Sequence, residues 1–157
     1  MAYLDIISLA DAKVYLRVDD DLIEDDAQIT RMISGALSYV ENYTNYILFA
    51  RDKDFRLIDG KVRIYDYPIN SYTLPIEADY DTIENKTLHT NLTDGSGNEL
   101  VSINVGYAST NNIPNELLEV AYEIIGIYYF GKESGKTMAD ISPLNKQALN
   151  QYKRFIL

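Results

Sequence analysis

Hydrophobic residues recur at helical spacing in the first third of the chain. Between Asp25 or Asp26 and Tyr43 they fall three or four positions apart, which predicts one long amphipathic helix. Its apolar stripe is Ile29, Met32, Ile33, Ala36, Leu37, Val40 and Tyr43. A shorter helix is predicted from about Leu9 to Arg17, because Ser8-Leu9-Ala10-Asp11 resembles a capping box that starts a helix.

The pattern changes to an alternation of period two between Ile47 and Tyr107. Asp59-Gly60 lies between two apolar segments, and this arrangement predicts a β-hairpin about a tight turn. We expect the hairpin strands at 55–58 and 61–65, two further strands at 88–92 and 100–107, and a turn at 94–98. Val101, Ile103 and Val105 alternate with polar residues, so one face of the last strand should be buried.

Helical spacing returns after Pro114, which suits the first position of a helix. We expect that helix to run to Phe130 and to end at Gly131. A mobile loop at 132–141 and a last helix from Ser142-Pro143 to the C-terminus should follow. The predicted fold is one α+β domain over 1–157, mainly α, with two N-terminal helices, a small antiparallel β region and two C-terminal helices.

Composition and charge narrow the class of protein. The chain has 157 residues, 46% of them hydrophobic, with a net charge of −10 and no cysteine. The absence of cysteine excludes disulfides and thiolate chemistry, and the acidity disfavours a general surface for binding phosphates. No apolar run is long enough for a transmembrane helix, and no signal peptide is predicted. The fourteen tyrosines fit either half-buried surface or subunit interfaces.

Three features invite a chemical interpretation, and none of them supports one. The segment Gly131–Thr137 has three residues between its glycines, whereas a phosphate-binding loop needs four, and a helix precedes it instead of a strand. The acidic stretch Asp19–Asp26 lacks the alternating ligands and the glycine of a calcium loop. His89 is the only histidine and is interpreted as an ordinary strand residue. We therefore predict no catalytic residue, cofactor or metal, and no enzyme.

Charge is distributed unevenly. The acidic cluster, defined as Asp19, Asp20, Asp21, Glu24, Asp25 and Asp26, lies between the two predicted N-terminal helices. The C-terminal stretch 143–157 carries Lys146, Lys153 and Arg154 and no acidic residue. A basic last helix suits either docking onto a partner or the dipole of the helix C-terminus.

Several motifs resemble the head–tail connector (adaptor) family of tailed bacteriophages. Ser8–Asp19 is similar to the opening of that family, and Tyr39–Asn45 is similar to the way its long helix ends. Ile103–Ala108, Ile113-Pro114 and Tyr128-Tyr129 resemble later family features in the same order. The chain departs from the family pattern at Phe130-Gly131-Lys132, and the segment 76–98 matches no family motif.

The resemblance implies a virion structural protein of the phage neck, assembled in the host cytoplasm. Such proteins form a ring below the portal, here expected to be twelve-fold, which extends the DNA channel and serves as an attachment platform for neck or tail proteins. Double-stranded DNA would pass without specific binding, and no membrane would be involved. A tail-completion or stopper protein, and a small bacterial regulatory or scaffolding protein, remain alternatives.

Two sets of residues become candidate sites under this interpretation. The acidic cluster is expected on the channel lumen or the outer surface, where negative charge repels DNA phosphates. The C-terminal helix is expected to dock on the portal protein, and its candidate docking residues are Lys146, Lys153, Arg154, Phe155 and Leu157. The alternative for this helix is that it packs on the helix predicted at 114–130.

Overall fold

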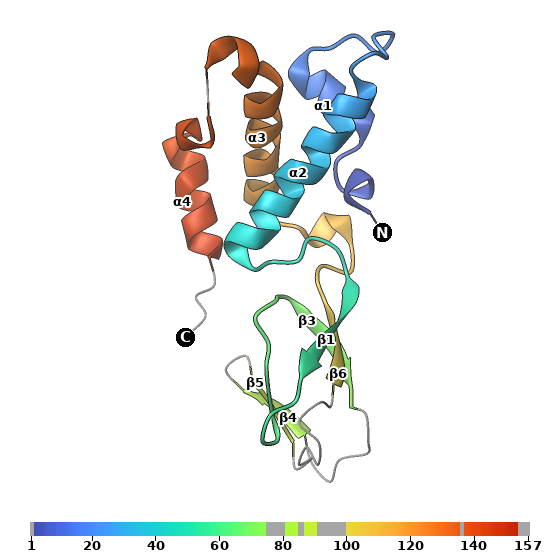
Figure 1. The fold of residues 1–157 in the computed structure, drawn as a ribbon, viewed down its shortest axis with the longest axis vertical. Coiled ribbons are helices and arrows are strands. Elements are labelled where there is room, and N and C mark those ends of the chain that lie inside the picture. Colours follow the sequence, from blue (N-terminus) through green and yellow to red (C-terminus); the bar gives the residue numbers. More distant parts are fainter. Residues whose placement is uncertain (1, 75–80, 85–86, 91–99, 136, 154–157) are drawn as a thin grey trace.

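A computed structural model describes residues 2–74, 81–84, 87–90, 100–135 and 137–153. The molecule is elongated, with a helical part at one end and the strands at the other (Figure 1). The chain crosses from helices to strands after α2 and returns through β6, so the first and last described helices, η1 and α4, both belong to the helical part. The α+β class, mainly α, is confirmed.

The N-terminal helices are formed as the apolar periodicity predicts. The 3-10 helix η1 (Tyr3–Asp5) precedes α1 (Leu9–Leu16), and the long helix is α2 (Asp26–Thr44). The Ser8 side chain accepts a hydrogen bond from the Asp11 amide and so caps α1. The predicted stripe of α2 is the buried one, since five of its members are completely buried: Ile29, Ile33, Ala36, Leu37 and Val40.

The C-terminal helices differ from the prediction in length. Helix α3 (Asn115–Ser134) runs past Gly131 and ends where Gly135 adopts a left-handed conformation. The expected loop at 132–141 is therefore short: it contains the 3-10 helix η3 (Met138–Asp140), capped by Thr137, and leads to the buried Ile141. Helix α4 (Pro143–Tyr152) ends before the C-terminus.

The strands form two small antiparallel sheets. In the first, β6 (Leu100–Val105) lies between β1 (Arg51–Arg56) and β3 (Ile69–Thr73). In the second, β5 (Thr87–Thr90) lies between β2 (Lys61–Arg63) and β4 (Asp81–Glu84). The short 3-10 helix η2 (Thr110–Asn112) connects β6 to α3. The sequence pattern did not predict β3 or β4, while His89 lies in β5 as expected.

The predicted hairpin at Asp59-Gly60 is only partly correct. The turn exists, since both residues have positive φ and Ile58 and Lys61 exchange two backbone hydrogen bonds of 2.9 Å. The flanking strands do not pair with each other beyond this point, because β1 pairs with β6 and β2 pairs with β5. The turn thus passes the chain from one sheet to the other. The turn predicted at 94–98 lies outside the described residues.

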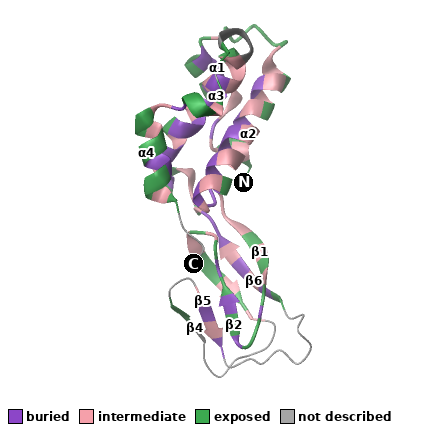
Figure 2. Ribbon diagram, turned by 60° about the vertical axis from the view of Figure 1, so that its left-hand side comes forward, coloured by how far each residue is buried: buried purple, intermediate pink, exposed green. Residues whose placement is uncertain are grey.

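The fold has one apolar core in the helices and another between the sheets, and Figure 2 shows buried positions along both parts. Val101, Ile103 and Val105 of β6 are completely buried, as their alternation predicts. Where the two parts meet, Gly106 has φ +112°, and a Cβ atom there would collide with the Phe49 carbonyl. Only glycine fits this crossing of the chain.

Candidate assembly surfaces

The acidic cluster lies in a loop that is organised around the ammonium group of Lys13. Lys13 Nζ donates to the carbonyl oxygens of Asp20 (3.1 Å) and Leu22 (2.9 Å), and it lies 2.6 Å from Asp26 Oδ1. The lysine is only 4% exposed. Lys13 lies one helical turn after Leu9 and one before Leu16, so it is on the apolar face of α1. This spacing could have indicated that the lysine points into the molecule, but it was not recognised from the sequence.

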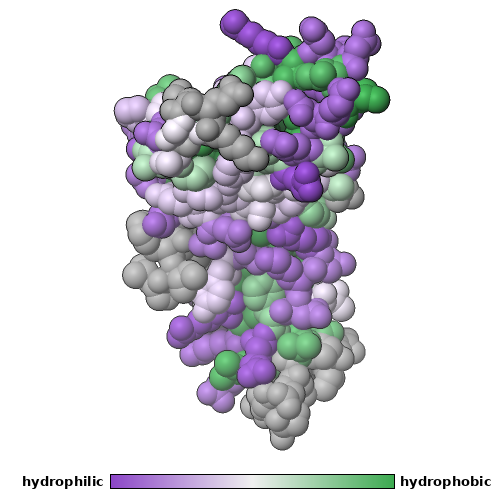
Figure 3. Space-filling model, turned by 45° about the horizontal axis from the view of Figure 1, so that its top comes forward, coloured by the Kyte–Doolittle hydropathy of each residue, from purple (hydrophilic) through white to green (hydrophobic). Residues whose placement is uncertain are grey.

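The members of the cluster have different surroundings. Asp19, Asp20, Asp21 and Glu24 are exposed, whereas Asp25 accepts a hydrogen bond of 2.7 Å from the Tyr129 hydroxyl and Asp26 pairs with Lys13. Leu22 and Ile23 are exposed among these four exposed acids, and Ile23 is 70% exposed. In the space-filling view, hydrophobic and hydrophilic side chains lie side by side at the helical end (Figure 3). Within the described residues, no three acidic or histidine side chains converge to hold a metal ion.

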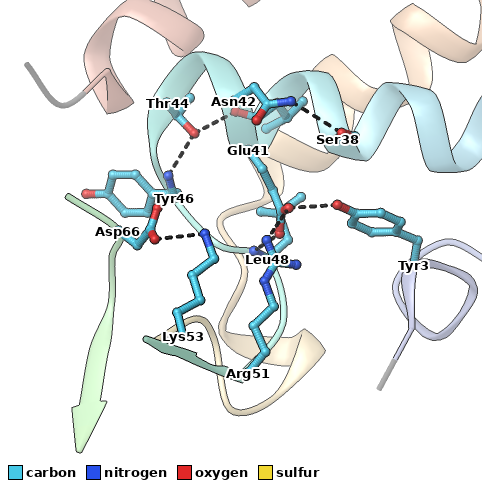
Figure 4. A network of polar contacts seen from close by, with 11 residues as sticks. Tyr3, Ser38, Glu41, Asn42, Thr44, Tyr46, Leu48, Arg51, Lys53 and Asp66 are labelled. Atoms are coloured by element: carbon cyan, nitrogen blue, oxygen red, sulfur yellow. Dashed lines mark hydrogen bonds and ion pairs between the residues drawn. The ribbon is translucent and has the colours of Figure 1, made fainter. Parts of the chain in front are cut away.

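A second buried charge connects the helices to the strands. The Glu41 carboxylate, 5% exposed, accepts hydrogen bonds from the Tyr3 hydroxyl (2.7 Å), the Leu48 amide (2.7 Å) and Arg51 (3.0 Å). Figure 4 shows Tyr3 on one side of Glu41, and Leu48 and Arg51 below it. Burial, together with the hydrogen bond to Glu41, raises the pKa of Tyr3 above its usual value. The network fixes η1 and the start of β1 against α2.

Helix α4 is packed against the bundle. Glu123 on α3 accepts hydrogen bonds from the Ser142 amide (2.8 Å), the Ser142 hydroxyl (3.0 Å) and the Asn145 side chain (2.6 Å), which holds the start of α4. Ala148 and Leu149 are buried in the helical core. Helix α4 therefore packs against α3, which is the arrangement that the sequence left open as the alternative to a docking helix.

The candidate docking residues are only partly available on this helix. Lys146 donates to the Ala139 carbonyl (2.6 Å), and the Lys153 ammonium lies 4.8 Å from the centre of the Tyr43 ring. Arg154, Phe155 and Leu157 lie outside the described residues. Leu144 of α4, an apolar residue, is 75% exposed.

Aromatic residues line the junction of the helical and β parts. Tyr46 contacts the rings of Tyr67, Tyr107 and Tyr152 at centroid distances of 4.9, 6.3 and 5.5 Å. Burial raises the pKa of six tyrosines of the described chain: Tyr3, Tyr15, Tyr39, Tyr107, Tyr122 and Tyr152. Many tyrosines therefore serve the fold, and Tyr15 and Tyr67 remain partly exposed.

A basic hollow at the β end was not predicted from the sequence. It has a volume of about 570 Å³ and contains three exposed cations, Arg56, Lys61 and Arg63. Its apolar members include the exposed Ile58 and Tyr65. The cations are dispersed along the sequence and mixed with acids, so only the fold brings them together.

The family profile of the phage gp6-like head–tail connector proteins matches residues 6–98, well over half of the chain. The chain belongs to this family. The matched region includes α1, the acidic cluster, α2 and most of the strands, so it covers the first two motifs of the resemblance, Ser8–Asp19 and Tyr39–Asn45. The motifs from Ile103 onward lie beyond the matched residues. A search of curated proteins finds no match.

Two solved structures show that the connector fold extends over the whole chain. A chain in the neck of the empty gene transfer agent (GTA) particle, computed with C6 symmetry, has a TM-score of 0.70 at 15% identity. The match covers 97% of the connector described here and 91% of that chain. A chain in the virion of the native GTA particle has a TM-score of 0.76 at 15% identity, and the match covers 100% and 94% of the two chains. Among the described residues, no helix is long and apolar enough to cross a membrane.

Proposed function

We propose that this connector forms a closed ring between the portal and the tail, extends the DNA channel and provides the platform on which further neck or tail proteins assemble. The observation that carries the proposal is the family match over 6–98, joined to a fold shared over nearly the full length with chains of a GTA neck and virion. The role is structural, and the connector is not an enzyme. Its place is the virion neck, after assembly in the host cytoplasm.

The electrostatics suit a channel that DNA passes through. With a net charge of −10, copies around a channel present negative potential to the phosphates, so the duplex slides without binding. The neck of the empty GTA particle was computed with C6 symmetry, and a six-fold axis suits rings of either six or twelve copies. We propose twelve.

The portal contact is proposed for the C-terminal segment. Lys153 marks the end of α4, and the sequence continues with Arg154, Phe155, Ile156 and Leu157, which combine a cation with three apolar side chains. An acidic and apolar site on the portal would suit this segment. Because Ala148 and Leu149 belong to the core, deletion of all of 143–157 would damage the fold. A shorter truncation after Lys153 is the appropriate test.

The test is to mix the purified connector with purified portal and to measure the mass of the complex by native mass spectrometry. We expect a monomeric or weakly associated connector alone and a complex of twelve connectors with the portal ring. The variant truncated after Lys153 should keep its melting temperature and lose portal binding. If the full chain binds only to an assembled connector ring or to the tail, it is a stopper or tail-completion protein, and the proposed position is wrong.

A further inference from the structure

The two ends of the connector carry complementary surfaces. At the helical end, the acidic loop 19–24 exposes Leu22 and Ile23 among four exposed acids. At the opposite end, the basic hollow exposes Ile58, which is 57% exposed, beside three cations. The long axis of the molecule separates the ends, so a chain cannot bring its own two surfaces together (Figures 1 and 2).

The cationic side chains of the hollow differ in their polar partners from most other cationic side chains of the described residues. Lys13, Arg51 and Lys53 form ion pairs within the chain, and Lys146 and Lys153 contact a carbonyl and a ring. In contrast, the side chains of Arg56, Lys61 and Arg63 have no hydrogen-bond or ion-pair partner within the described residues. Three cations that make no direct polar contact within the described residues, set around exposed apolar groups, suit an acidic and apolar protein segment.

The composition of the hollow argues for protein over DNA. Asp54 and Asp59 also line it, and these carboxylates repel the uniform charge of a phosphate backbone as well as any acid placed beside them, so an occupant must keep its acids on the three cations. A protein segment can place its acids against the three cations and its apolar side chains against Ile58 and Tyr65. The loop 19–24 has this composition: four exposed acids and two exposed apolar side chains.

Both surfaces are held in place before any contact forms. The ammonium of Lys13 fixes the carbonyls of Asp20 and Leu22, and the reciprocal hydrogen bonds between Ile58 and Lys61 fix the turn beside the hollow. Preformed surfaces lose less conformational entropy when they associate. Four acids against three cations also make the expected contact strongly dependent on salt.

We propose that the acidic loop 19–24 of one copy docks in the basic hollow of a second copy, as a subunit contact of the connector assembly. Such a contact joins two different surfaces, is therefore heterologous, and repeats from copy to copy until the rotation closes a ring. This inference rests on the proposed ring for its setting. In this arrangement the exposed acids of the loop contact a neighbouring subunit, and other acidic residues of the surface repel the DNA.

Cysteine cross-linking tests the contact without background, because the chain has no cysteine. A mixture of the Ile23→Cys and Ile58→Cys variants, oxidised at high concentration and again on portal-bound rings, should give a cross-linked dimer that neither variant gives alone. A chain with both substitutions should give a ladder of multimers. The matched control pairs Ile23→Cys with Leu144→Cys, another exposed residue, and should give at least tenfold less dimer.

Charge reversal supplies a second measurement. Lys61→Glu with Arg63→Glu should lower the cross-linking yield at least fivefold, and a partner carrying Asp20→Lys with Asp21→Lys should restore it. Rings that form with no dimer above the Leu144 control, or with no rescue, would overturn this contact and leave the proposed ring intact. If the chains give a cross-linked ladder but never bind the portal, the subunit contact is supported and the proposed position in the neck is contradicted.

Discussion

Replacing Lys13 with methionine removes one ammonium group while keeping most of the apolar stem. That group donates to two loop carbonyls and pairs with Asp26, whose side chain is 31% exposed. Removing one partner of a fully buried ion pair costs about 3–5 kcal/mol. Since water reaches Asp26 and the loop, we expect a smaller loss, about 2–3 kcal/mol of the free energy of unfolding.

Urea unfolding followed by circular dichroism measures this loss, with Lys61→Met as the control because Lys61 is exposed. The control should change stability by less than about 0.5 kcal/mol. For a domain of this size, Lys13→Met should lower the melting temperature by roughly 4–12 °C. Hydrogen exchange should also accelerate in the loop 19–24. A Lys13→Met protein as stable as the control, with unchanged exchange, would refute the assigned role of this lysine.

Three further predictions follow from the fold. Gly106→Ala should prevent stable folding, because the new Cβ atom would collide with the Phe49 carbonyl. Gly135→Ala has open space around it and should lower the free energy of unfolding by only about 1–2 kcal/mol, the cost of a left-handed alanine. Expression level and thermal unfolding of the two variants compare these effects. Glu123→Ala should cost about 1–3 kcal/mol by releasing the start of α4, and the exposed Glu119→Ala should be nearly neutral in the same urea assay. The six tyrosines with raised pKa hold their protons more tightly when folded. The stability that they contribute should therefore be fully present below about pH 10 and be lost as the pH rises above it. Urea titrations at pH 8 to 11, with absorbance at 295 nm to follow tyrosine ionisation, would contradict this if stability did not fall at the alkaline end.

The helices could be predicted from the sequence because their stabilisation is local. The stripe of α2 and the Ser8 cap of α1 are set by residues three or four apart, and the structure has both. Gly131 was misread as a helix end, since a glycine within a helix costs only about 1 kcal/mol. The packing of α3 offsets that cost, and Gly135 supplies the end four residues later.

The pairing of the strands and the candidate surfaces could not be predicted from the sequence, because they are formed by residues that are far apart in the chain. The Asp59-Gly60 turn was predicted, but the partners of its flanking strands lie tens of residues away in β5 and β6. Spacing along the chain cannot give such pairing. The basic hollow likewise appears only when β1 and β2 lie together. The acidic cluster was visible in the sequence, whereas its organisation by Lys13 required the fold.

The central claim is that this connector forms a ring at the portal vertex. Image reconstruction of the neck in particles assembled with a tagged chain tests it most directly. We predict a closed ring of twelve tagged copies that contacts the portal on one side and a neck or tail protein on the other, around an open channel. Particles that carry the tag elsewhere, or that complete their necks without this chain, would contradict the claim.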